Sequence, residues 1–111
     1  ILCNLYGVPY IPGCMTIKEI VTAMEAGSEM IKLFPGSVFG PGYIGAIKSP
    51  LPQASLMVTG GVKLDNVKSW LDAGVDAIGV GGELNKLGAQ GRFDEVKSVA
   101  AQYVQKVKEA R

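Results

Sequence analysis

Residues 26–34 read AGSEMIKLF: a helix end, a glycine, an acidic residue and then an apolar run broken only by Lys32. Residues 73–80 read AGVDAIGV and repeat that order. Two explanations fit the likeness: an internal repeat, or two helix-to-strand turns that solve the same geometry. Under either explanation the same unit recurs two units apart along the chain, which is the pattern of a barrel built from strand–helix units.

Further apolar runs and helical patterns extend this alternation along the whole chain. Strands are predicted at 8–11, 30–34, 56–59 and 77–80, helices at 16–26, 43–47, 65–73 and 93–108, and a Gly- and Pro-rich loop at 35–42. Thr16 and Glu19 form a T-x-x-E capping box at the start of the first helix, and Gly27 follows its end. Because apolar strands of this kind are buried on both faces and βαβ crossovers are right-handed, the order predicts an α/β fold with one parallel sheet and outer helices.

The chain has 111 residues, whereas a complete (β/α)8 barrel needs roughly 250. Ile1, Leu2 and Leu5, followed by Gly7, are typical of the last turn of an earlier helix. We therefore expect residues 1–111 to form a single partial domain, with a truncated helix tail at 1–6, that begins inside a longer protein.

The composition narrows the classes of partner. Eleven basic and ten acidic residues give a net charge of +1 without a basic stripe, so no nucleic-acid partner is expected. The apolar runs are far shorter than a membrane span and no signal peptide is visible, so no membrane partner is expected either. Cys3 and Cys14 are too few for a disulfide framework or a zinc site, and free thiols favour a reducing, cytoplasmic location.

The absence of histidine narrows the chemistry. No His-based triad, imidazole base or His-ligated metal is available, so proton transfer falls to carboxylates, Lys, Tyr, Cys or water. Cys14 follows a proline and a glycine at the end of a predicted strand, and it could line the open face of the sheet. Tyr43 is expected in the core or in the wall of a substrate site.

Lys32 is the most conspicuous candidate for chemistry. It interrupts an otherwise apolar strand and shares a strand face with Met30 and Phe34. Burial of an amine favours its neutral form, which is a nucleophile that can form a Schiff base with a ketone. The alternative from spacing alone is a structural lysine at the strand end, paired with a carboxylate of an adjacent strand.

Two glycine-rich turns follow the third and fourth predicted strands. They read TGGV at 59–62 and GVGGE at 79–83, and neither is a dinucleotide fingerprint or a Walker loop. Glycines allow a close approach of backbone N–H groups to an anion, to which the next helix N-terminus could add its dipole, although each turn alone could be a tight βα connection. Taken as a pair, they match the phosphate site after the last two strands of a (β/α)8 barrel, and this would place a missing half upstream.

Four segments, in this order and spacing, carry a family resemblance: IPG at 11–13 with Thr16, IKLFP at 31–35, VTGGV at 58–62 and IGVGG at 78–82. Over nearly the whole chain they resemble the 2-keto-3-deoxy-6-phosphogluconate (KDPG) and 4-hydroxy-2-oxoglutarate (KHG) aldolases. The resemblance implies the C-terminal half of a (β/α)8 TIM barrel, supplying about its last four βα units. It also implies a homotrimer and chemistry without a metal or cofactor.

The resemblance also implies residue roles. Lys32 would form the Schiff base at C2 of a keto-acid substrate, and cleavage of the C3–C4 bond would release pyruvate. The second product would be glyceraldehyde 3-phosphate from KDPG, or glyoxylate from KHG. Thr59, beside the aldehyde, would influence stereochemistry. The substrate-binding residues implied by the resemblance are Phe34, Thr59, Gly60, Gly61 and, completing the phosphate cradle, Gly82.

The sequence departs from the family at two points. The general-base glutamate and the carboxylate-binding arginine of the family lie on early strands that this chain lacks, so slow turnover is expected from these residues alone. Glu83 stands where some members have a phosphate-binding serine, and its carboxylate would repel a phosphate dianion unless it points away. Two alternative functions remain: another phosphate-binding barrel, an isomerase or decarboxylase in which Lys32 acts by charge, and a non-catalytic half-barrel.

Overall fold

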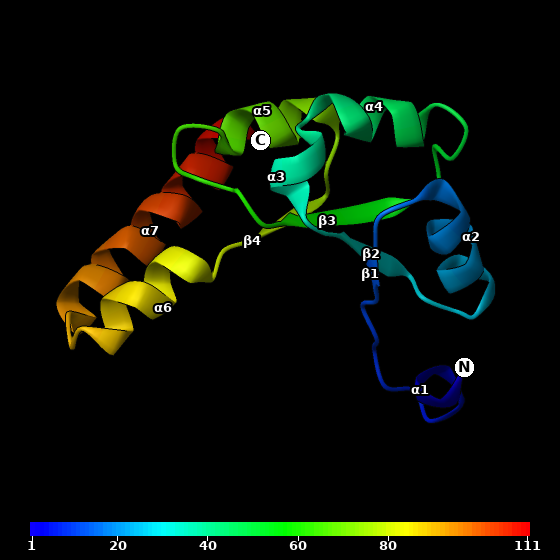
Figure 1. The fold of residues 1–111 in the computed structure, drawn as a ribbon, viewed down its shortest axis with the longest axis horizontal. Coiled ribbons are helices and arrows are strands. Elements are labelled where there is room, and N and C mark those ends of the chain that lie inside the picture. The colour runs from blue at the N-terminus through cyan, green and yellow to red at the C-terminus, as the bar shows by residue number, and fades with distance from the viewer.

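A computed structural model describes residues 1–111 and contains one four-stranded parallel sheet (Figure 1). The strands lie side by side in chain order and are β1 (Gly13–Cys14), β2 (Met30–Leu33), β3 (Ser55–Thr59) and β4 (Ala77–Gly79). All three neighbouring pairs are parallel. The predicted α/β class is confirmed, and the strands predicted at 30–34, 56–59 and 77–80 lie within one residue of their predicted ends.

Helices connect and follow the strands. They are α1 (Leu2–Leu5), α2 (Ile17–Glu25), α3 (Gly36–Phe39), α4 (Gly42–Lys48), α5 (Val67–Ala73), α6 (Gly82–Ala89) and α7 (Phe93–Ala110). The sequence did not predict α3, a single turn inside the expected loop, or α6, whose two glycines weaken its helical signal. Packing against α7 stabilises α6, whose own sequence has a low helix propensity. No helix is both long and apolar enough to cross a membrane.

The first strand is displaced from its predicted position. A strand was predicted at 8–11, but those residues have no regular structure and β1 lies at Gly13–Cys14. The prediction was wrong because Pro9 and Pro12 have no N–H group to donate to a neighbouring strand. The Pro12 carbonyl still accepts a hydrogen bond from the backbone N–H of Lys32 at 2.9 Å, so the chain joins the sheet there.

The start of α2 is fixed by the predicted capping box. The Glu19 N–H donates to Thr16 Oγ1 at 3.2 Å, and the Thr16 N–H donates to Glu19 Oε1 at 3.1 Å. The Thr16 hydroxyl also donates to this carboxylate, and these hydrogen bonds lower the pKa of Glu19. The capping box is therefore confirmed.

The two similar helix-to-strand turns share their glycine geometry but differ in the contacts of their acidic residues. Gly27 and Gly74 both adopt positive φ, +99° and +111°. Asp76 Oδ2 accepts the Leu56 N–H at 2.9 Å, whereas the exposed Glu29 side chain makes no hydrogen bond within the chain. The likeness between the segments thus rests on turn geometry, which favours the second explanation.

The sheet has one covered face and one open face. Along β2 and β3, burial alternates: Ile31, Leu33, Leu56 and Val58 are fully buried, and the residues between them are only half-buried. In Figure 1, α4 and α5 lie over the covered face. Lys32 is on the opposite face by strand alternation.

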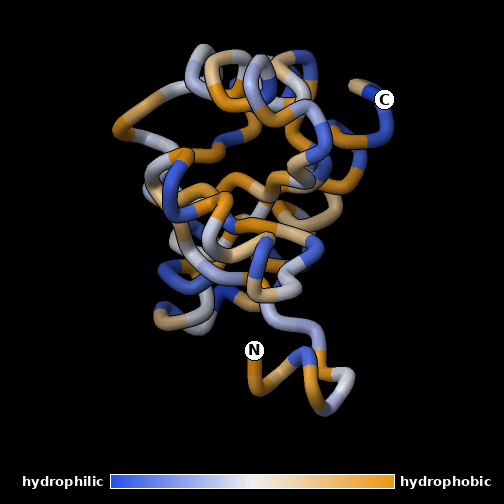
Figure 2. The backbone as a smooth tube through the Cα atoms, turned by 90° about the vertical axis from the view of Figure 1, so that its right-hand side faces the viewer, coloured by the Kyte–Doolittle hydropathy of each residue, from blue (hydrophilic) through white to orange (hydrophobic).

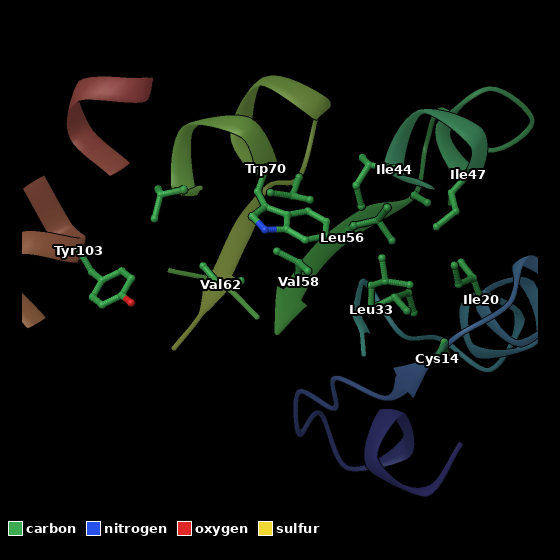
Figure 3. Close-up of a cluster of buried hydrophobic side chains, with 14 residues drawn as sticks. Cys14, Ile20, Leu33, Ile44, Ile47, Leu56, Val58, Val62, Trp70 and Tyr103 are labelled. Carbon is green, nitrogen blue, oxygen red and sulfur yellow. The ribbon is translucent and has the colours of Figure 1, made fainter. Parts of the chain in front are cut away.

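The core lies between the covered face and the helices. Figure 3 shows Trp70, Ile44 and Ile47 above the strand residues Leu56 and Val58. The buried apolar residues form one cluster, composed of Cys14, Ile20, Ile31, Leu33, Ile44, Ile47, Ala54, Leu56, Val58, Val62, Val67, Trp70, Val75 and Tyr103. The core therefore holds the strands from one side only.

The N-terminal segment lies at the periphery of the molecule (Figure 2) and meets the rest of it at Gly27, where an added Cβ would lie 2.7 Å from Asn4 Cγ. Its single helical turn, α1, occupies the predicted helix tail, and Ile1, Leu2 and Leu5 are 88%, 68% and 74% exposed. Gly7 ends this turn with a φ of +64°. The segment contributes no buried apolar residue to the core.

Candidate active site

The ends of β2, β3 and β4 border an open cavity of about 1040 Å³ at one edge of the sheet. Because parallel strands all end at the same edge, the segments after them come together there. The cavity is lined by every residue that the sequence predicted for the site: Lys32, Phe34, Thr59, Gly60, Gly61 and Gly82.

Lys32 lies in the middle of the sheet, between Gly13 of β1 and Met57 of β3. Its side chain is half-buried, and its ammonium nitrogen lies 4.7 Å from the centre of the Phe34 ring. It takes no part in the three ion pairs of the chain. The alternative of a structural lysine paired with a neighbouring carboxylate is therefore not what the structure contains.

The turn after β2 packs against the turn after β3. Gly60 and Gly61 adopt positive φ, +83° and +76°. A Cβ atom on Gly61 would lie 2.6 Å from Cβ of Ser37, and one on Gly60 would lie 3.2 Å from the Phe34 ring. The glycines are needed both for backbone conformation and for this close approach.

Asn66 braces the TGGV turn, and the sequence pattern did not predict this contact. Its Oδ1 accepts the backbone N–H of Lys63 at 2.8 Å, and its Nδ2 donates to the carbonyl of Gly61 at 2.8 Å. α5 begins only at Val67 and is seven residues long, so the expected contribution of its dipole to this turn is not supported. The Asn66 side chain shapes the turn instead.

Thr59 lies at the end of β3 and faces the cavity. Its hydroxyl oxygen is buried yet has no hydrogen-bond partner in the chain. Neighbouring Gly79 of β4 leaves room for its methyl group, because a Cβ on Gly79 would lie 2.3 Å from Thr59 Cγ2. An unsatisfied buried hydroxyl in the cavity that Lys32 also lines is a group available to a bound molecule.

Glu83 lies in the first turn of α6, directly after the glycines of the second turn. It lines the cavity, and its Oε2 accepts a hydrogen bond from the Tyr103 hydroxyl of α7 at 2.7 Å. Burial, together with this hydrogen bond, raises the pKa of Tyr103 to about 12. The carboxylate is therefore held by a neutral phenol donor at neutral pH.

Charged residues that the sequence reasoning missed also line the cavity. They are Lys63, Asp65 and Lys86. Neither Lys63 nor Lys86 forms an ion pair within the chain. Both lysines closely follow the glycine-rich turns in the sequence, and that position was the available signal.

Two other candidates do not belong to the cavity. Cys14 is 4% exposed and packs in the core, and burial raises the pKa of its thiol, so the suggestion that it lines the open face was wrong. Tyr43 is partly buried and packs against the core, where it stacks on Phe39 and donates a hydrogen bond to the Met15 carbonyl at 2.8 Å.

Comparison with known proteins places this chain in a family. A family model described as "KDPG and KHG aldolase" matches residues 2–100. The chain is 40% identical over 106 residues to the 2-dehydro-3-deoxy-6-phosphogalactonate aldolase of Escherichia coli K12, covering 95% of this chain and 51% of that protein. It is 38% identical over 65 residues to the 2-dehydro-3-deoxy-phosphogluconate aldolase of Pseudomonas aeruginosa, covering 58% of this chain and 30% of that protein.

The solved structures agree. A structure described as "Native KDPGal structure" superposes with a TM-score of 0.89 at 38% identity, over 96% of this chain and 52% of that one. The chain thus spans about half the length of the E. coli aldolase and of this solved structure. The sequence resemblance is confirmed at the level of the family: the chain belongs to the KDPG and KHG aldolases.

Proposed function

We propose that the protein is a class I aldolase in which Lys32 is the Schiff-base lysine. The observation that carries the proposal is the position of Lys32 on the open face of the sheet, facing the cavity without a carboxylate partner. The family membership and the two glycine-rich turns beside the lysine support it. No carboxylate of the chain forms an ion pair with the Lys32 side chain, so its amine is available to a carbonyl compound.

The proposed reaction is a retro-aldol cleavage. The Lys32 amine adds to the C2 ketone and water leaves, giving an imine whose protonated form withdraws electrons. The C4 hydroxyl loses its proton as the C3–C4 bond breaks, so that C4 becomes an aldehyde and the bonding pair forms an enamine. Protonation at C3 and hydrolysis of the imine then release pyruvate and the free lysine.

The substrates we propose are 2-keto-3-deoxy-6-phospho sugar acids, KDPG or its galactonate epimer, and 4-hydroxy-2-oxoglutarate. The names of the E. coli and Pseudomonas relatives support the first two, which differ only at C4. Phe34 would pack beside the keto acid, and Thr59 would contact the aldehyde end and influence the configuration at C4. Gly60, Gly61 and Gly82 would receive the phosphate or the distal carboxylate.

We also propose that this chain supplies one half of a (β/α)8 barrel. The open face and the unpaired edges of the sheet, together with coverage of about half of the relatives, support this. The other half would provide the general base and the arginine that holds the substrate carboxylate, and the complete protein would be a homotrimer. Residues 1–111 alone should then turn over slowly, and turnover matching that of the E. coli relative would contradict the proposal.

Borohydride trapping with pyruvate tests the role of Lys32. Reduction should fix a pyruvyl group on Lys32, located by peptide mass spectrometry, and the adduct should vanish in Lys32→Ala. Lys63→Ala and Lys86→Ala are matched controls, because both lysines line the same cavity and should leave the adduct on Lys32. The Schiff-base assignment would be refuted if the wild-type protein carried no adduct on Lys32, or carried it on another cavity lysine instead.

A further inference from the structure

The mouth of the cavity contains a carboxylate at a place where an anion is expected. Glu83 is in the first turn of α6, whose first N–H groups have no partner within the helix, and it follows the glycines of the second turn. A phosphate held at this turn would meet the Glu83 charge at short range. Like charges at such a distance repel strongly when they are partly shielded from water.

A buried tyrosine donates a hydrogen bond to this carboxylate. Tyr103 is 5% exposed, and its hydroxyl donates to Glu83 Oε2 at 2.7 Å. Tyr103 belongs to the core and is not among the residues that line the cavity, whereas Glu83 is. Figure 3 shows the Tyr103 ring extending from α7 toward Val62. The hydrogen bond therefore directs one oxygen of the Glu83 carboxylate toward Tyr103 of α7.

The remaining charges at the mouth favour an anion. Lys63 and Lys86 line the cavity without forming ion pairs, and their ammonium groups are free to meet a bound anion. Asp65 also lines the cavity, and its charge contributes to raising the pKa of Tyr103. Of these two carboxylates, only that of Glu83 accepts the hydrogen bond of the phenol.

We propose that Tyr103 is a positioning residue that holds the Glu83 carboxylate clear of the glycine-rich turns, and thereby sets the preference of the cavity for substrates whose far end is a phosphate. The proposal rests on the proposed function and specifies its substrate class. It resolves the apparent conflict between a carboxylate at residue 83 and a phosphate cradle. Without the phenol hydrogen bond, the Glu83 side chain can rotate toward the turn and repel the phosphate.

Tyr103→Phe tests this, because it keeps the ring in the core and removes only the donor. We expect KM for a 2-keto-3-deoxy-6-phospho sugar acid to rise about threefold to tenfold with kcat little changed, the signature of lost ground-state binding. KM for the matching sugar acid without phosphate should stay within twofold. A rise in KM that is equal for both substrates would show that Tyr103 only supports the packing of α6, and would overturn the proposal.

A double-variant experiment identifies the group through which Tyr103 acts. In Glu83→Gln, which lacks the charge, adding Tyr103→Phe should no longer weaken phosphate binding. In Asp65→Asn, the matched control with the other carboxylate removed, Tyr103→Phe should still weaken it. If Glu83→Gln alone weakens phosphate binding, or if the effect of Tyr103→Phe persists in the Glu83→Gln background, the proposal is wrong.

Inorganic phosphate separates this proposal from the Schiff-base proposal. Its dissociation constant, measured by titration calorimetry on each folded variant, should follow the same pattern without any turnover. Failure to trap pyruvate on Lys32 would refute the aldolase chemistry and leave this binding test intact. Glu83→Gln changes an exposed residue and supplies a readable variant even if Tyr103→Phe does not fold.

Discussion

Replacing Gly79 by alanine should destabilise the protein through a single methyl group of Thr59. A Cβ at Gly79 would lie 2.3 Å from Thr59 Cγ2, and the next nearest atoms are 3.6 and 3.8 Å away. The first distance is more than 1 Å shorter than the optimal carbon–carbon separation of about 3.5–4.0 Å. The conflict is therefore severe and confined to one atom.

The expected magnitude follows from two opposing effects. Overpacking of this kind costs about 1–3 kcal/mol of folding free energy. Because φ of Gly79 is not positive, alanine also gains about 0.4–1 kcal/mol by restricting the unfolded chain. Thr59 lies on β3 between β2 and β4 and has little room to move. We expect Gly79→Ala to lower the free energy of unfolding by about 1–2 kcal/mol.

Thr59→Ser provides the decisive comparison, because it removes the conflicting methyl group and keeps the hydroxyl. In that background, Gly79→Ala should be neutral or slightly stabilising. Urea unfolding of the wild-type protein, the two single variants and the double variant measures the coupling between the positions. If the two changes add within about 0.5 kcal/mol, the steric argument is refuted.

Three further outcomes are expected. Asn66→Ala should lower the free energy of unfolding by about 1–2 kcal/mol and weaken inorganic phosphate binding, as measured by urea unfolding and calorimetry; unchanged binding would show that the brace is dispensable. The lowered pKa of Glu19 gives stability that is present above the ordinary value of 4.5 and is lost as pH falls through the folded-state pKa, so Glu19→Gln should flatten acid unfolding curves below that value. The pKa of Tyr103 is raised from 10.0 to about 12, so its contribution to stability is fully present below pH 10 and is lost as the pH rises from 10 to 12. Over that range the difference in free energy of unfolding between wild type and Tyr103→Phe should shrink by roughly 2–3 kcal/mol. A difference that stays constant would contradict the assignment.

Much of the fold could be predicted because its signals are local. The apolar runs gave three of the four strands, and Thr16 with Glu19 gave the start of α2. The failures have equally local causes. Pro9 and Pro12 exclude a strand at its predicted position, so the first strand forms further along the chain. The glycines of α6 weaken its helical pattern, and the helix depends on its packing against α7.

The candidate site was predictable to the extent that topology alone brings residues together. Lys32, Thr59 and Gly82 come from three different strand ends, and a parallel sheet places all three at one edge. The brace from Asn66 and the hydrogen bond from Tyr103 to Glu83 could not be found in this way. They depend on side-chain directions within a turn and between two helices, which no periodicity encodes.

The alternation of burial along β2 places residues selected for stability next to residues selected for the cavity, within a strand of four residues. Ile31 and Leu33 are constrained by packing in the core, where a lost methyl group reduces stability. Lys32 is half-buried and faces the cavity, so core packing constrains it much less. Evolution or a designer can therefore vary the cavity side of a strand without rebuilding its helix side. In this architecture the residues that line the cavity can change while the scaffold stays the same.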